Sequence, residues 1–313
     1  MSSSPVAGPL RTIIAHELRT LRREGIFSTL LGIFSAVTLF SVFIGWSTRS
    51  TTLAIYAATV ATLKAAGVSH IAPNPLLGVS SLAIFNNLII YTLLVGALFA
   101  IVIGHRSFVR DRKSGVVPLL LSRPAGRPLY IAGKLCGISA ALLLVLCGMF
   151  VVSVLSTLFI PALYLSGGEF LSLAAFYAVS FVYLAFFAAL GLLFGVYTSN
   201  ESLALLALVL AWIAVVFILP ELSTGQNPVS LLNPVTLAHA SAASGAFFSY
   251  ARAILGPFSF GQDYTALALH FLRISANALN VGAILKLLAA SMIAGAASVF
   301  ALQKYSTTAD QIA

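Results

Sequence analysis

Six apolar runs, each about 18 residues or longer, divide this chain and leave little sequence outside them. The runs fall at about 26–46, 82–104, 129–160, 170–197, 202–219 and 281–302. A helix needs about 20 apolar residues to cross the hydrocarbon core of a bilayer, because each residue advances about 1.5 Å through a core of about 30 Å. The sequence therefore predicts an all-α polytopic membrane protein, a single domain over 1–313 with six transmembrane helices.

The composition agrees with this fold class. Hydrophobic residues make up 60% of the 313 residues, whereas soluble domains contain about 45–50%. The formal net charge of +9 would suggest a nucleic-acid partner for a soluble protein. Here the basic residues adjoin the apolar runs, where anionic lipid head groups and the positive-inside bias explain them. We therefore expect the lipid bilayer as a partner and no nucleic acid.

The segment before the first apolar run has the pattern of an interfacial helix. Within 11–25, Ile14, Leu18 and Leu21 recur at helical spacing, and most arginines point away from them. A cleavable signal peptide is the competing interpretation. The run that follows is too long for the apolar core of a signal peptide, and no small-residue cleavage site ends it.

Two connections on the opposite side of the membrane carry few charges. We expect 47–81 to be an external loop with a short helix at 53–66, and 221–280 to be an external region rich in Gly, Ser, Pro and Asn. A helix over 264–280 would lie at the outer interface. It would carry four polar residues on one face: His270, Arg273, Asn277 and Asn280.

A basic segment between the second and third runs predicts the orientation. The stretch 106–134 contains seven of the chain's 17 Lys and Arg residues and one acid. Since Lys and Arg in short loops stay on the cytoplasmic side, we expect a multi-pass protein of the cell (plasma) membrane with both termini in the cytoplasm. Lys134 should extend back to the cytoplasmic interface, as long basic side chains do.

No internal energy source or catalytic site is visible in the sequence. All eight acidic residues fall in loops or at the ends of the runs, whereas a self-contained secondary transporter or channel would need an ionisable group within a span. The closest approach to a P-loop, 126–135, has Pro128 and Leu135 where Gly and Ser or Thr are required. The five histidines show no metal-ligand spacing. An intramembrane enzyme would also need paired carboxylates or a Ser/His pair at matched depth, so we predict no catalytic residue and no metal site.

The basic segment has two possible roles, a topology signal alone or a docking element for a soluble partner. An apolar stretch, Val116–Leu121, lies among the charges, and the pairs Arg123-Pro124 and Arg127-Pro128 follow it. A short helix can bury such an apolar face in a partner's groove while its charges set the orientation. This pattern favours docking.

At these residues the chain resembles the permease subunits of type-2 ABC exporters, in particular the six-span subfamily that includes the permease of the nitrous-oxide-reductase maturation exporter. Leu119 to Arg127, LLLSRPAGR, matches that family's Leu-Leu-Ser/Thr-x-Pro-x-x-Arg stretch, and Gly133-Lys134 follows at the start of the third span. The N-terminal RTIIAHELRTLRREGIF is similar to the family's connecting helix. Leu232-Asn233-Pro234 resembles the Leu-Asn-Pro that follows its fifth span.

The resemblance implies a half-transporter without catalytic activity of its own. Two such subunits, identical or related, would enclose a pathway for export. Two copies of a separate ABC ATPase would use ATP and Mg²⁺ and would dock on a short cytoplasmic coupling helix within 105–128. The implied docking residues are Arg110, Asp111, Arg112, Gly115, Leu119, Leu120, Leu121, Ser122, Arg123, Pro124 and Arg127.

The substrate pathway is less well marked. Polar residues near the outer part of the second span, Asn86, Asn87 and Tyr91, are candidates. Hydrogen bonding between helices is the competing role for each of them.

Overall fold

The computed structural model describes residues 7–68, 71–74, 76–115, 117, 127–160, 163–198, 200–224 and 245–309. These residues are mostly helical and contain no strand, and six of the helical segments are long and apolar enough to cross a membrane. The predicted all-α polytopic fold with six candidate spans is therefore confirmed.

The helices follow one another with short links. The first is α1 (Ala7–Arg23), followed by the first span, α2 (Ile26–Ala65). The second span combines η1 (Ser81–Phe85), α3 (Asn86–Tyr91), η2 (Thr92–Gly96) and α4 (Ala97–Lys113). The third and fourth spans are α6 (Arg127–Leu158) and α7 (Gly167–Tyr197). The fifth combines α8 (Glu201–Ile213), η4 (Ala214–Ile218) and α9 (Leu219–Thr224). After α11 (Ala246–Leu255), η6 (Gly256–Phe258) and α12 (Phe260–Phe271), the sixth span is α13 (Val281–Ala309).

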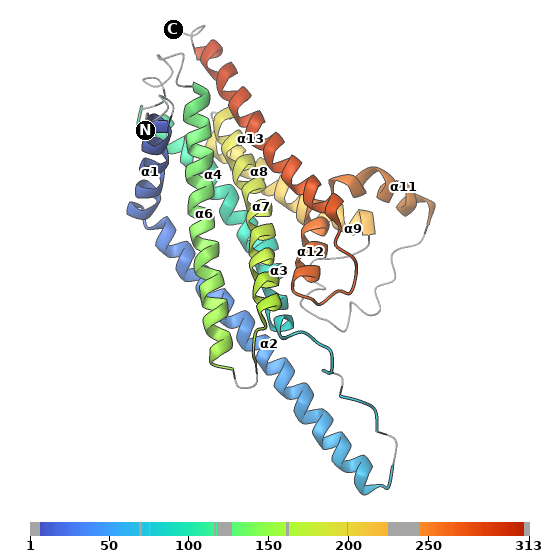
Figure 1. The fold of residues 1–313 in the computed structure, drawn as a ribbon. Helices are drawn as coiled ribbons and strands as arrows, with labels where there is room; N and C mark the ends of the chain where they lie inside the picture. The colour runs from blue at the N-terminus through green and yellow to red at the C-terminus, as the bar shows by residue number, and fades with distance from the viewer. Residues whose placement is uncertain are drawn as a thin grey trace.

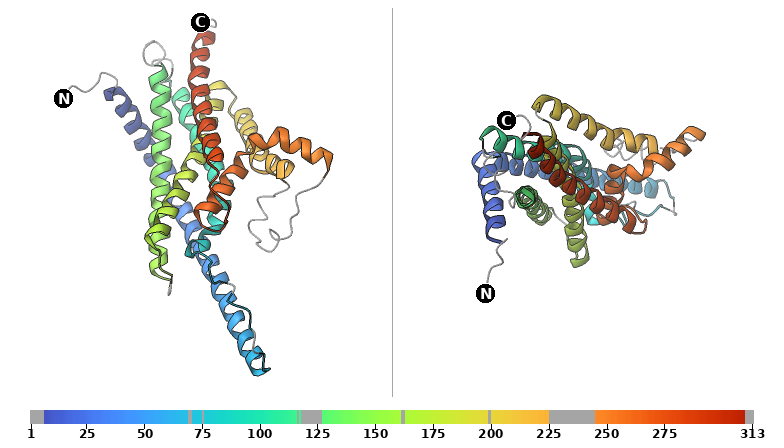
Figure 2. Two further views of the ribbon diagram at one scale, coloured as in Figure 1. Left: turned by 45° about the vertical axis from the view of Figure 1, so that its right-hand side comes forward. Right: turned by 90° about the horizontal axis from the view of Figure 1, so that it is seen from above.

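The spans form an elongated bundle with two distinct ends (Figure 1). The start of α1, the end of α4 and the end of α13 lie at one end, which we call the network end after the contacts described below. At the other end, which we call the far end, α2 extends beyond all the other helices. The segment α11 projects from the side of the bundle (Figures 1 and 2).

The first span is a single helix of 40 residues, where the sequence analysis expected a helix of about 21 residues and then a loop with a separate short helix at 53–66. Residues 53–65 are helical as expected, but they continue the span without a break. Residues 47–65 contain neither Gly nor Pro, so nothing in this stretch interrupts helical hydrogen bonding. The helix ends at Ala65, and Gly67 shortly after it adopts a left-handed φ of 77°. Backbone bonds from Gly67 to Lys64 and from Val68 to Leu63 complete a Schellman cap.

The predicted helix over 264–280 is wrong in both length and position. The helix α12 ends at Phe271, and Arg273 has a φ of 55° that no right-handed helix contains. The apolar face of α12, with Tyr264 and Leu267 fully buried, packs against α7 and α13. The apolar residues of this stretch therefore hold it in the bundle, and the polar residues that follow do not share a helical face with His270.

The central helix pair, α4 and α7, packs with almost no side-chain layer between the two backbones. A β-carbon at Gly104 would collide with the carbonyl oxygen of Ala188, and one at Gly191 would collide with that of Ile101. Small residues allow this approach, which maximises van der Waals contact between helices that have no water to exclude. The pair forms the core against which the other spans pack.

We predict that Gly104→Ala separates α4 from α7 and lowers stability by about 1–3 kcal/mol, the usual cost of overpacking. Gly32→Ala in α2 is the matched control, because a β-carbon there meets no atom within 4 Å. Thermal unfolding of the two purified variants in detergent measures the difference. Equal unfolding midpoints would show that the close approach at Gly104 is not required.

Candidate functional site

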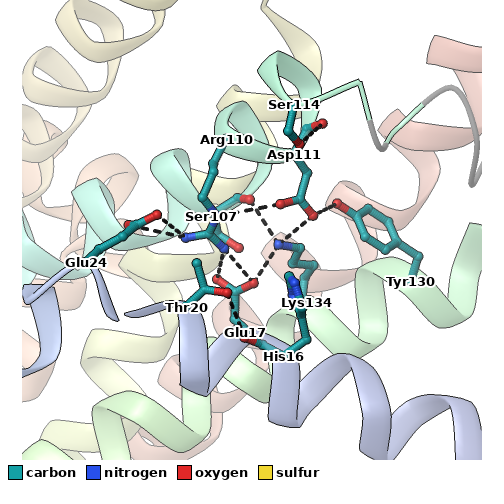
Figure 3. A network of polar contacts seen from close by, with 10 residues as sticks. All are labelled: His16, Glu17, Thr20, Glu24, Ser107, Arg110, Asp111, Ser114, Tyr130 and Lys134. Carbon is teal, nitrogen blue, oxygen red and sulfur yellow. Dashed lines mark hydrogen bonds and ion pairs between the residues drawn. The ribbon is translucent and has the colours of Figure 1, made fainter. Parts of the chain in front are cut away.

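A buried ammonium group joins three helices at the network end (Figure 3). The side chain of Lys134 on α6 is 1% exposed, and its Nζ lies 2.5 Å from Glu17 Oε2 on α1 and 2.8 Å from Asp111 Oδ2 on α4. It also donates to the carbonyl oxygen of Ser107 at 3.1 Å. All three ammonium protons therefore have an acceptor. The charge of Lys134 is held inside the protein by two carboxylates and does not reach solvent.

A second cation completes the cluster. Arg110 on α4 donates from Nη2 to both carboxylate oxygens of Glu17 at 2.9 Å, and its Nη1 lies 3.4 Å from Glu24 at the partly exposed rim. Tyr130 on α6 donates its hydroxyl proton to Asp111 Oδ2 at 2.6 Å. We call these six residues the buried network: Glu17, Glu24, Arg110, Asp111, Tyr130 and Lys134.

Its charges balance at the centre, where two carboxylates face two cations. Taking a charge out of water costs several kcal/mol, and an ion pair offsets this only with good geometry and further hydrogen bonds. The carbonyl of Ser107 and the hydroxyl of Tyr130 supply those additional bonds. The network is therefore stable only when α1, α4 and α6 are all in place.

Two glycines let α1 approach α6 closely enough for these contacts. A β-carbon at Gly133 would lie 2.6 Å from Ile13 Cγ2, and one at Gly137 would lie 2.7 Å from Glu17 Cβ. They are four residues apart, so they lie on one face of α6. This small-residue face brings the Glu17 carboxylate within reach of Lys134.

The end of α4 also contacts the fourth and fifth spans. Arg112 donates from Nη1 to the carbonyl oxygens of Thr198 at 2.9 Å and Gly195 at 3.3 Å, at the C-terminal end of α7. A cation there also complements the helix dipole. Lys113 Nζ lies 3.0 Å from Glu201 Oε2 at the start of α8. Because α4 leads into residues 115–126 and α6 leads out of them, the base of that segment is tied to α1, α7 and α8.

The predicted docking residues fall into three groups. Arg110 and Asp111 are engaged in the buried network, and Arg112 contacts the end of α7. Gly115 follows α4 with a φ of 70°, in the left-handed region that Gly favours. Arg127 is the first residue of α6. The remaining predicted docking residues lie outside the described residues: Leu119, Leu120, Leu121, Ser122, Arg123 and Pro124.

The sequence analysis missed Glu17 and Tyr130. One signal for Glu17 was present, since this acid lies on the same helical face as Ile14, Leu18 and Leu21. An acid on an apolar face needs a buried cation, and Lys134 was available near the end of the third span. Tyr130 carried no comparable signal.

The candidate pathway residues lie at the far end. Asn86 and Asn87 line a pocket of about 260 Å³ between α2 and the start of the second span. Tyr91 is partly buried and packs against the hydrophobic core instead. In the part of the chain that the structure describes, no group of three His, Cys, Asp or Glu residues could hold a metal ion.

Comparison with known proteins gives one family. The family model for the ABC-2 family transporter protein matches residues 11–300. No curated protein matches the chain significantly. The match includes α1, the buried network and all six candidate spans.

We predict that Lys134→Met lowers stability by about 3–5 kcal/mol, because it leaves two buried carboxylates with one cation fewer. Lys113→Met is the matched control, since the side chain of Lys113 is 67% exposed in its pair with Glu201 and such pairs contribute about 0–1 kcal/mol. Thermal unfolding in detergent compares the two variants. Similar losses for both would contradict the assigned role of the buried network.

Proposed function

Because the chain belongs to the ABC-2 transporter family, we propose that it is the membrane permease subunit of an ATP-driven exporter. The chain lacks a P-loop, so ATP and Mg²⁺ are bound by a separate ABC ATPase, and the permease itself is not catalytic. Two copies of the ATPase act on two permease subunits, identical or related. We also propose that the chain belongs to the six-span subfamily that its motifs resemble.

Charge distribution supports an arrangement with the network end in the cytoplasm. The described cations gather there: Arg11, Arg19, Arg22, Arg23, Arg106, Arg110, Arg112, Lys113 and Lys134. Fewer lie away from it: Arg49, Lys64, Arg252, Arg273 and Lys286. The positive-inside bias assigns the richer end to the cytoplasm. Both termini and the segment 105–128 are then on the side where ATP is available, in a cell (plasma) membrane.

The observation that carries the coupling proposal is the set of contacts at the base of residues 115–126. Asp111 at the end of α4 contacts both Tyr130 and Lys134 at the start of α6. Arg110 and Lys134 add α1 to this unit through Glu17. A displacement of the segment by an ATPase would therefore move α1, α4 and α6 together, as a rigid-body switch requires.

The docking surface itself is assigned to residues that the buried network does not use. Arg110 and Asp111 satisfy each other and their neighbours inside the protein, so they position the segment. Val117 is 1% exposed and packs in a core cluster with Phe108 and Tyr130, so it belongs to the permease itself. The apolar residues Leu119–Leu121 and Arg123 remain as the contacts that we propose for the partner's groove. This division separates docking variants from variants that break the fold.

We predict that Leu120→Asp abolishes co-purification of the chain with its proposed ABC ATPase partner, because a charge replaces a side chain that enters an apolar groove. Arg123→Glu should weaken the association about tenfold or more. Lys64→Glu, at the far end of α2, should leave it unchanged. Full association of Leu120→Asp would refute the docking assignment, and transport by the chain without any ATPase would favour a secondary transporter.

A second prediction separates force transmission from docking. Tyr130→Phe removes the hydroxyl that donates a hydrogen bond to Asp111, and it preserves the aromatic ring. We expect the ATPase to bind this variant normally, while substrate-stimulated ATP hydrolysis by the reconstituted complex falls several-fold. Ser249→Ala, which removes a hydroxyl from exposed α11, is the control. Unchanged stimulation in Tyr130→Phe would mean that this contact does not transmit movement.

A further inference from the structure

The pocket at the far end combines apolar walls with a few polar groups. Ile44 on α2, Ile84 on η1 and Ile274 after α12 line it together with Arg49, Asn86 and Asn87. Its volume of about 260 Å³ exceeds that of several water molecules, each of which occupies about 30 Å³ in the liquid. The pocket is therefore large enough for part of an organic ligand.

Close packing at one glycine forms the pocket. A β-carbon at Gly45 would collide with the backbone of Ile84, so α2 touches η1 directly at this level. Beyond Gly45, α2 continues past the bundle toward its tip (Figure 1). The chain returns through residues 76–80, which place Leu76 and Val79 on the opposite wall. The pocket is part of the backbone arrangement and does not depend on a single side-chain rotamer.

Arg49 supplies a positive charge that no described residue neutralises. Within the described residues, the structure shows no hydrogen bond or ion pair for its guanidinium group. Two other cations near the far end do have partners, since Arg273 donates to Ser172 and Lys286 pairs with Asp263. A guanidinium group offers five N–H donors in a planar fork that suits phosphate. The pocket therefore favours an anion.

The depth of Arg49 corresponds to the lipid head groups. From Ile26, the first residue of α2, a hydrocarbon core of about 30 Å is crossed in about 20 residues, which ends near Trp46. Trp is enriched at this boundary, and Arg49 lies about one turn beyond it. Phosphate groups of lipids occupy this level, next to the apolar side chains of the pocket.

The two amides lie deeper than the guanidinium group. Ile84 is level with Gly45, where the two backbones touch, and Asn86 and Asn87 follow it toward the bundle interior. A glycerophospholipid presents its acceptors in the same order, with the phosphate outermost and the acyl ester oxygens below it. The amide groups can donate to ester oxygens, while Ile44 and Ile84 contact the chains.

We propose that this pocket binds an anionic glycerophospholipid of the surrounding membrane. The phosphate accepts hydrogen bonds from Arg49, and the ester oxygens accept from Asn86 and Asn87. The site concerns lipid binding at the far end and does not depend on ATPase docking at the network end. It adds a ligand that neither the fold class nor the family assigns to these residues.

Native mass spectrometry of the purified full-length chain tests the proposal, with phosphatidylglycerol and phosphatidylcholine of identical acyl chains as the two probes. We expect the chain to retain phosphatidylglycerol in preference to phosphatidylcholine. Arg49→Gln should reduce that preference about tenfold, the effect of losing one charge-assisted interaction. Lys64→Gln is the matched control, since Lys64 is also a cation of α2 but does not line the pocket.

Three outcomes would overturn the proposal. The first is an unchanged preference in Arg49→Gln, or an equal loss in Lys64→Gln, which would indicate general surface attraction. The second is displacement of the lipid by millimolar inorganic phosphate, which would indicate a site for a free anion. The third outcome concerns Val79→Trp, which places a larger side chain in the wall of the pocket. If this variant changes from dimer to monomer but keeps its bound lipid, the occupant of the pocket is a second copy of the chain.

Discussion

The buried ammonium group of Lys134 is the interaction on which the network end depends. Its charge is compatible with burial only because Glu17 and Asp111 reach it from two other helices, and those carboxylates in turn need Arg110. None of these four charged residues can be removed without leaving a charge uncompensated. An amphipathic N-terminal helix, which alone would be free to lie anywhere on a membrane surface, is thereby fixed to the base of the second and third spans.

The sequence predicted the fold class well and the polar contacts poorly. Apolar content and length are local properties, so the six candidate spans could be located from composition alone. The continuation of the first span into residues 53–65 was missed because 47–81 as a whole was predicted as a loop with a separate short helix, although no residue of 47–65 breaks a helix. The pairing of Glu17 with Lys134 joins residues 117 positions apart. Periodicity within one segment carries no information on which distant segment supplies the opposite charge.

The two ends of the bundle use polar groups differently. At the network end, the charged groups of the buried network come from three helices and satisfy one another, which favours a role in holding elements together. At the far end, Arg49 lies in a pocket with its donors unused by the described residues, which favours a ligand. Sequence position alone does not distinguish a structural role from a ligand-binding role here, because the buried network and the pocket both contain polar residues near the ends of predicted spans.

The uninterrupted length of α2 has a mechanical consequence. At about 1.5 Å per residue, its 40 residues extend about 60 Å. A link of only two residues joins its first turn to α1, and the buried network holds α1 in place. A helix without Gly or Pro between Trp46 and Ala65 has no hinge in that stretch. A tilt of about 10° at its first turn therefore displaces its tip by about 10 Å. The helix therefore has the geometry of a lever arm, in which a small rotation at the network end produces a large displacement of the tip at the far end.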